Sequence, residues 1–125
     1  MIMVIGGAYQ GKASYARNLY PDIKWIDGAE CGFEEIYSCE GILHFHKYIK
    51  RAMRSGMELA AFAKELTERN PDLILTSDEI GYGIVPIDPF EREYREKTGR
   101  ICTELAAFSK EVHRVICGIG TVIKG

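Results

Sequence analysis

A glycine-rich segment near the start of the chain constrains its fold more than any other feature. The segment GGAYQGK follows the apolar run MIMVI and precedes residues 13–19, which have helical character. Gly6, Gly11 and Lys12 have the GxxxxGK spacing of a phosphate-binding loop. A strand, a glycine loop and a helix in this order present backbone N–H groups and a helix dipole to one anion. We therefore predict a nucleotide phosphate site formed by Gly6, Gly7, Ala8, Tyr9, Gln10, Gly11, Lys12, Ala13 and Ser14.

The residue after the lysine departs from the motif. Ala13 stands where a serine or threonine hydroxyl usually binds Mg²⁺, and Ser14 comes one residue late, about 100° away around a helix. Mg²⁺ would then be carried by nucleotide oxygens and waters, with an acid such as Asp27 or Asp78 in its outer shell. We expect nucleotide binding to tolerate this change better than phosphoryl transfer. The alternative is a plain glycine-rich turn without a ligand.

Composition places the chain among ordinary globular proteins. It has 125 residues, 46% hydrophobic and 27% charged, with a formal net charge of −2. Such values fit one domain spanning residues 1–125 and indicate no general attraction to nucleic acid or anionic membranes. No apolar run approaches the roughly 20 residues that span a bilayer, and no signal peptide is recognisable. We expect a cytoplasmic protein whose four cysteines are reduced, since they form no CxxC pair.

Apolar and helical segments alternate along the chain. We expect strands near 1–5, 23–27, 41–46, 73–76, 112–117 and 121–124, the last two forming a hairpin around Gly118-Ile119-Gly120. Segment 41–46 can instead open the helix that follows. Helices are expected at 13–19, at 47–70 with an interruption near Gly56, and at 91–111, where Tyr94, Ile101, Leu105 and Phe108 can share a buried face. Residues 28–40 and 80–89 are expected to be mostly loop. This alternation predicts a three-layer α/β domain with a mainly parallel sheet and a C-terminal β-hairpin.

Two acids follow the expected strand at 73–76. Asp78 and Glu79 stand where parallel sheets place their ligands, so either can orient Mg²⁺ or accept a hydroxyl proton. The alternative is an acid pair that caps a turn before a glycine loop.

The segment SDEIGYGIVP, together with GGAYQGK and the terminal VICGIGTVIKG, resembles the bifunctional adenosylcobinamide kinase / adenosylcobinamide-phosphate guanylyltransferase family. In that family a phosphate loop opens the chain. A T-N-E-V-G-x-G-I-V-P-like segment, a helix with Gly-Arg and Leu-Ala pairs, and a G-I-G turn follow. The matching residues are Ser77, Asp78, Glu79, Ile80, Gly81, Gly83, Ile84, Val85, Pro86, Gly99, Arg100, Leu105, Ala106, Gly118 and Gly120.

The resemblance implies a P-loop NTPase-like fold, ATP or GTP as the nucleotide, a corrinoid substrate and assembly into a homo-oligomer. It also implies a kinase that moves a γ-phosphoryl group to a hydroxyl of adenosylcobinamide, and guanylyl transfer through a histidine. Lys12 would stabilise charge on the transferring group, and Asp78 or Glu79 would handle magnesium or the acceptor proton.

Departures from the family bear on activity. Family members are longer and carry a paired-histidine segment, whereas residues 28–40 are too short and contain no histidine. We therefore expect guanylyltransferase activity to be lost. His44 and His46 align with the family's next strand, where an acid normally ends the apolar run. A catalytically degraded nucleotide-binding protein with a regulatory or assembly role is the alternative to a kinase.

Two further clusters admit more than one interpretation. His44 and His46 would lie on one face of a strand, where they can bind a metal or phosphate, provide a nucleophile, or simply be hydrogen-bonded. A basic helical stripe can be a solvated face or a docking surface for an anionic substrate or partner. It consists of Lys47, Lys50, Arg51 and Arg54.

Overall fold

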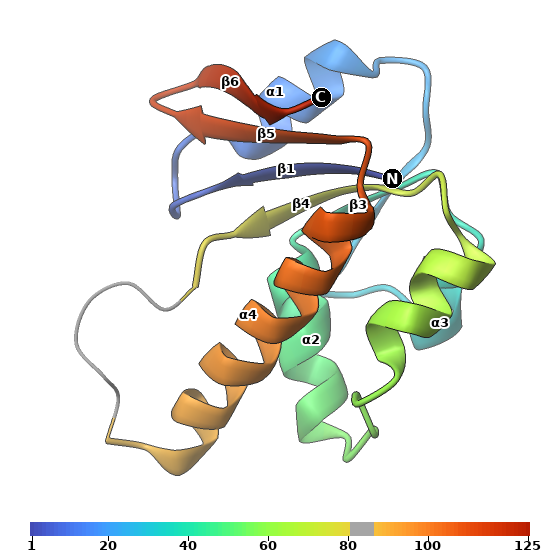
Figure 1. Ribbon diagram of the computed structural model, residues 1–125, viewed down its shortest axis with the longest axis vertical. Coiled ribbons are helices and arrows are strands. Elements are labelled where there is room, and N and C mark those ends of the chain that lie inside the picture. Colours follow the sequence, from blue (N-terminus) through green and yellow to red (C-terminus); the bar gives the residue numbers. More distant parts are fainter. Residues whose placement is uncertain (81–86) are drawn as a thin grey trace.

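A six-stranded sheet organises the computed structural model, which describes residues 1–80 and 87–125 (Figure 1). The strands are β1 (Ile2–Gly6), β2 (Trp25–Asp27), β3 (Gly41–Leu43), β4 (Ile74–Asp78), β5 (Glu111–Ile116) and β6 (Ile119–Lys124). Their order in the sheet is β2-β3-β4-β1-β5-β6. Each neighbouring pair is parallel except β5 and β6, which are antiparallel.

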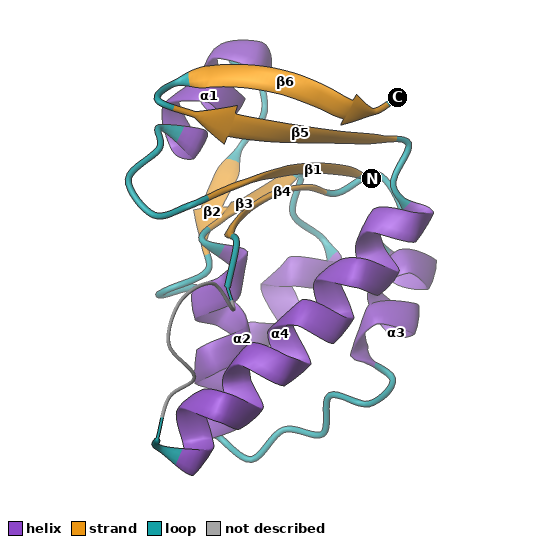
Figure 2. Cartoon of the chain, turned by 60° about the vertical axis from the view of Figure 1, so that its left-hand side comes forward, coloured by secondary structure: helices purple, strands orange, loops and turns teal. Residues whose placement is uncertain are grey.

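Helices cover both faces of this sheet (Figure 2). They are α1 (Lys12–Leu19), α2 (Phe45–Arg54), α3 (Phe62–Arg69) and α4 (Pro89–Phe108), with a short 3₁₀ helix, η1, at Phe33–Tyr37. Successive strand residues point to opposite faces. Val4 accordingly packs with Ala16 of α1, whereas Met3 belongs to the core beneath α2, α3 and α4. The predicted three-layer α/β fold, with its mainly parallel sheet and C-terminal hairpin, is confirmed.

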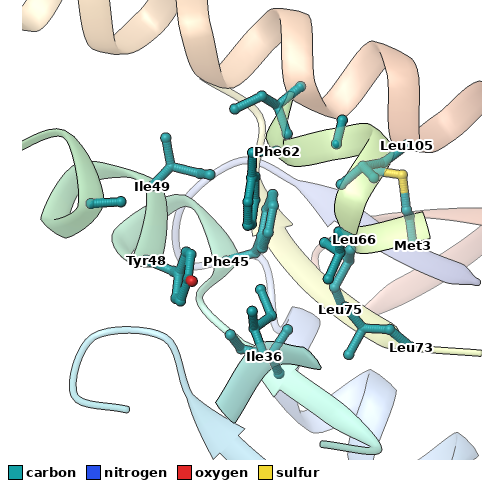
Figure 3. Packing of buried hydrophobic residues seen from close by; sticks show 14 of the residues in the cluster. Met3, Ile36, Phe45, Tyr48, Ile49, Phe62, Leu66, Leu73, Leu75 and Leu105 are labelled. Atoms are coloured by element: carbon teal, nitrogen blue, oxygen red, sulfur yellow. The ribbon is translucent and has the colours of Figure 1, made fainter. Parts of the chain in front are cut away.

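The larger core lies between the sheet and the three helices on one face (Figure 3). At its centre the rings of Phe45, Tyr48 and Phe62 stack, with centroids 5.7–6.3 Å apart. Burial of such rings is a main source of core stability. The ring stack thereby holds α2 against α3.

The α4 helix ends earlier than predicted. Tyr94, Ile101 and Leu105 are buried as expected, but Phe108 is 48% exposed. The helix stops at Phe108 because Ser109 takes an extended conformation and its hydroxyl donates to the Leu105 carbonyl. Residue 111 already pairs with β1, so it cannot also be helical.

The segment 41–46 combines both expected alternatives, because its first half is a strand and residues 45 and 46 open the helix. The strand ends at Leu43, and α2 begins two residues later at Phe45. Between them His44 has a left-handed backbone with φ of 58°. His44 and His46 therefore do not share a strand face, which corrects the prediction that placed them there.

Two connections also differ from expectation. Residues 55–61 are not helical, so the second half of the expected 47–70 helix starts only at Phe62. The hairpin turns at Cys117 and Gly118, with φ of 50° and 76°, rather than at 118–120. Most of the predicted loop at 80–89, and with it the GYGIVP part of the family-like segment, lies outside the described residues. No helix in the described ranges has the length and apolar character needed to cross a membrane.

Candidate functional site

The loop between β1 and α1 depends on glycine at two positions. A Cβ atom on Gly6 would lie 2.5 Å from the Val115 carbonyl oxygen of the neighbouring strand. Gly11 has φ of 86°, a left-handed conformation that costs other residues energy, and it also lies close to Gly118. The motif glycines are therefore required by the backbone path itself, which leads directly into α1.

The tip of the hairpin holds this loop in place. The backbone N–H of Cys117 donates to the Gln10 side-chain Oε1 at 2.7 Å, and that of Gly118 donates to the Gln10 carbonyl at 2.8 Å. Sequence reasoning placed Gln10 in the phosphate loop but did not anticipate its bracing by the C-terminal hairpin. Nothing in the local sequence pairs residues so far apart.

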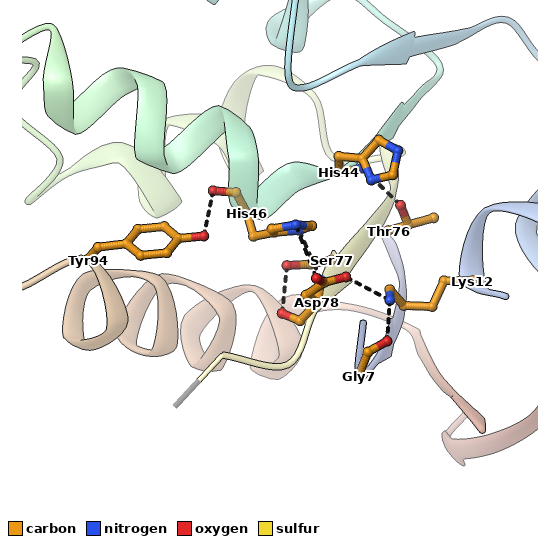
Figure 4. A network of polar contacts seen from close by, with 8 residues as sticks. All are labelled: Gly7, Lys12, His44, His46, Thr76, Ser77, Asp78 and Tyr94. Carbon is orange, nitrogen blue, oxygen red and sulfur yellow. Dashed lines mark hydrogen bonds and ion pairs between the residues drawn. The ribbon is translucent and has the colours of Figure 1, made fainter. Parts of the chain in front are cut away.

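Lys12 reaches back across the loop to the end of β4 (Figure 4). Its ammonium group donates to the Gly7 carbonyl at 2.7 Å and pairs with Asp78 Oδ1 at 2.7 Å. The parallel register of β1 and β4 sets Gly6 opposite Asp78 and so produces this meeting. The Lys12 side chain is only 8% exposed, against 26% for Asp78. The site thus contains a largely buried ion pair.

The two predicted acids separate. Glu79 donates its backbone N–H to the Gly6 carbonyl, but its carboxylate binds Arg114 of β5 through contacts of 2.8 and 3.0 Å. Glu79 and Arg114 line a cavity of about 460 Å³ beside α4. Of the two acids, Asp78 alone contacts Lys12 among the described interactions.

His46 joins the ion pair from α2. The Asp78 backbone N–H donates to His46 Nδ1 at 3.0 Å, and His46 Nε2 lies 3.3 Å from Asp78 Oδ2. Because Nδ1 accepts a hydrogen bond, the ring proton belongs on Nε2. Burial lowers the pKa of His46, and the negative charge of Asp78 offsets only part of that effect. The imidazole is therefore neutral. Sequence reasoning missed this contact because it placed His46 on a strand.

His44 caps the same helix without joining the ion pair. Its backbone N–H donates to Thr76 Oγ1 at 3.1 Å, and its ring meets that of His46 edge-on, with centroids 6.1 Å apart. The described residues contain no group of three or more histidine, cysteine or acidic side chains that would hold a metal ion.

A cavity of about 270 Å³ unites these groups. Its walls come from the phosphate loop, the first turns of α1 and α2, and the end of β4. The lining residues are Ala8, Tyr9, Gln10, Gly11, Lys12, Ala13, Ser14, His44, His46, Lys47, Thr76 and Asp78. Asp27 does not line it; its carboxylate accepts from the Ala29 N–H within its own turn. The cavity is lined by two lysines, Lys12 and Lys47, by the loop backbone and by one carboxylate, which suits a phosphate ligand.

The basic stripe of α2 is divided among different partners. Arg51 donates to the Gly28 and Cys31 carbonyls, Lys50 pairs with Glu91, and Arg54 lies over the Phe90 ring. Only Lys47 of this stripe lines the 270 Å³ cavity. Most of the stripe therefore anchors α2 to its neighbours rather than forming one anion-docking surface.

Comparison with known proteins identifies the family. The sequence model described as cobinamide kinase / cobinamide phosphate guanyltransferase matches residues 39–123. The Bifunctional adenosylcobalamin biosynthesis proteins CobU of Escherichia coli (strain K12) and Salmonella typhimurium (strain LT2) are each 42% identical to this chain over 52 residues. That alignment covers 42% of this chain and 29% of each relative. The region matched by the family model, residues 39–123, includes His46 and Asp78, whereas the predicted phosphate loop lies before it. The chain belongs to the cobinamide kinase / cobinamide phosphate guanyltransferase family.

Proposed function

We propose that the protein binds ATP or GTP at the phosphate loop and transfers the γ-phosphoryl group to a hydroxyl of adenosylcobinamide. The observation that carries this proposal is the pairing of the buried Lys12 with Asp78 inside a cavity lined by the loop. Family membership supports the choice of substrates, because the matched family is described as a cobinamide kinase.

Each group of the site has a role in this reaction. The amides of residues 7–13 and the N-terminus of α1 would cradle the phosphates, and Lys12 would neutralise charge on the transferring group. Asp78 would accept the proton of the acceptor hydroxyl as its oxygen bonds to phosphorus and the nucleoside diphosphate leaves. Magnesium would be carried by nucleotide oxygens and waters, with Asp78 in the outer shell, because Ala13 offers no hydroxyl.

We also propose that guanylyl transfer through His46 does not occur. A histidine nucleophile needs a free ring nitrogen. Both ring nitrogens of His46 contact Asp78: Nδ1 accepts from its backbone N–H, and Nε2 lies 3.3 Å from its carboxylate. This arrangement supports the loss expected from the short 28–40 segment.

The second candidate is a nucleotide-binding regulatory or assembly protein without catalysis. Ala13 favours it, because the hydroxyl that usually orients magnesium is missing. Calorimetry would support this alternative if nucleotide affinity did not depend on magnesium and no turnover occurred.

Incubation of the purified protein with γ-labelled ATP or GTP and adenosylcobinamide tests the kinase proposal. We expect labelled cobinamide phosphate in the presence of Mg²⁺ or Mn²⁺. Lys12→Ala should weaken nucleotide binding at least about tenfold, because it removes a charge-assisted contact to phosphate. Lys64→Ala, on the exposed side of α3, is the matched control and should bind normally. Unchanged binding by Lys12→Ala would overturn both candidate functions.

We further propose that the protein works in the cytoplasm as a homo-oligomer. All four cysteines are free thiols, which suits a reducing compartment. Self-association is supported by four exposed apolar side chains on the β5–β6 hairpin: Ile116, Ile119, Val122 and Ile123.

A further inference from the structure

One imidazole holds Asp78 at two points. His46 Nδ1 accepts from the Asp78 backbone N–H at 3.0 Å, and its Nε2 lies 3.3 Å from Asp78 Oδ2 (Figure 4). The first contact fixes the ring proton on Nε2, the nitrogen that lies 3.3 Å from the carboxylate. The imidazole thus restrains both the end of β4 and the side chain that projects from it.

His46 is itself held from a third element. The Tyr94 hydroxyl of α4 donates to the His46 backbone carbonyl at 3.1 Å. Both Tyr94 and His46 are buried, at 5% and 7% exposure. The position of the ring relative to β4 is therefore set by packing among α2, α4 and the sheet.

Asp78 occupies the contact that a phosphate would need. Lys12 has three N–H donors, of which one points to the Gly7 carbonyl and another to Asp78 Oδ1. A phosphate that binds Lys12 must compete with this carboxylate and overcome its negative charge. The orientation of Asp78 therefore influences the affinity of the site for anions.

We infer that His46 is a positioning residue for Asp78, which serves as the counter-ion of Lys12 until a phosphate displaces it. Because His46 Nε2 lies 3.3 Å from the second carboxylate oxygen, its N–H shares the charge of Asp78 and keeps the Lys12 pair weak enough to open. After displacement, the same contacts keep the carboxylate beside the phosphate. The inference rests on the proposed function in taking Lys12 as a phosphate-binding residue, but it does not require phosphoryl transfer.

Pyrophosphate binding measured by calorimetry tests this inference. Asp78→Asn should raise pyrophosphate affinity about tenfold, because Lys12 loses its competing counter-ion. His46→Phe keeps a ring but removes the donor, so the carboxylate should bind Lys12 more tightly and pyrophosphate affinity should fall severalfold. In the Asp78→Asn background His46→Phe should have no further effect, since His46 acts through Asp78. An equal effect in both backgrounds, or none in the wild type, would overturn the inference.

Two further variants separate positioning from folding. His46→Gln places an amide donor near Nε2 and should restore pyrophosphate affinity to within about threefold of the wild type. His46→Asn can keep an acceptor near Nδ1 without the donor, so it should fold like the wild type yet bind as His46→Phe does. Thermal unfolding verifies that each variant is folded. Similar affinities for the Gln and Asn variants would contradict the assigned role of Nε2.

A spectroscopic measurement distinguishes failure of this inference from failure of the proposed function. If the wild type bound no pyrophosphate, the proposed phosphate site would be lost, whatever His46 does. Long-range ¹H–¹⁵N NMR of the histidine rings reports the tautomer directly. We expect neutral His46 with its proton on Nε2 at pH 7. A proton on Nδ1, or an imidazolium, would contradict the positioning contact independently of any ligand.

Discussion

At the scale of single residues, the glycines of the phosphate loop differ in why they are needed. Gly6→Ala would drive a Cβ against the Val115 carbonyl, and we expect a loss of about 1–3 kcal/mol in the free energy of unfolding. Gly11→Ala must adopt a left-handed conformation, at a cost of about 1–2 kcal/mol. Gly99→Ala, in an open part of α4, is the control and should stabilise by about 0.5–1 kcal/mol. Urea unfolding measures the stability of the three variants. A Gly6→Ala protein as stable as the wild type would contradict the close approach of β1 and β5.

His46 should make stability depend on pH. Burial lowers the pKa of His46 in the folded protein. As the pH falls below about 6.5, His46 is therefore protonated in the unfolded chain before it is protonated in the folded protein. The folded state is therefore favoured at and above neutral pH and loses stability below it. Between pH 7.5 and 5.5 the free energy of unfolding of the wild type should fall by about 1 kcal/mol more than that of His46→Gln, whose side chain does not titrate. Equal losses in urea unfolding would show that His46 is not buried in its neutral form.

Individual residues also show how far the sequence predicts the site. Lys12 and Asp78 were predictable, because a loop motif and an acid at a strand end each mark positions beside a parallel sheet. The contact of Glu79 with Arg114 was not predictable, because Arg114 comes from a strand much later in the chain. His46 was misplaced because the GILHFH pattern suits a strand as well as a strand followed by a helix. The left-handed backbone of His44 ends the strand there, so that His46 lies in the helix that follows.

At the scale of elements, the strand ends were easier to predict than the connections. Apolar runs that end in glycine or an acid marked β1 and β4, and burial on both faces explains their composition. The length of the break at 55–61 was underestimated. Gly56, with φ of 82°, follows the end of α2, and the chain then continues without helix until α3 begins at Phe62. The hairpin turn shifted to Cys117, a residue rarely found at positive φ.

The hairpin is predicted to stabilise the phosphate loop through Gln10. Gln10→Ala removes the acceptor for the Cys117 N–H, and we expect nucleotide affinity to fall about threefold to tenfold while global stability changes by less than about 1 kcal/mol. Gln10→Glu keeps an acceptor oxygen but adds negative charge to the cavity. It should retain protection of the Cys117 amide from hydrogen exchange while binding nucleotide more weakly than Gln10→Ala. Loss of protection in Gln10→Glu would contradict the bracing contact.

At the scale of the whole molecule, the family match and the phosphate loop occupy different parts of the chain. Residues 39–123 supply Asp78, His46 and α4, whereas Lys12 and its loop come from the segment before them. The sheet unites the two parts, because β1 is inserted between β4 and β5. Lys12 comes from one part and Asp78 from the other. We therefore expect substitutions that shift β1 or β4 to change the geometry of the Lys12–Asp78 pair.

The β6 edge of this sheet leads to a prediction about assembly. β6 is the last strand in the sheet order, and Ile119 and Ile123 on it are 72% and 57% exposed. An exposed strand edge with apolar side chains favours pairing with another chain. We expect analytical ultracentrifugation to show an oligomer that Ile119→Lys with Ile123→Glu converts to monomers. Because both side chains are exposed, circular dichroism and thermal unfolding of the monomer should remain close to those of the wild type. As a control, Leu19→Lys, an exposed change at the end of α1, should leave the oligomer intact. A monomeric wild type, or a double variant that still associates, would mean that the hairpin does not mediate assembly.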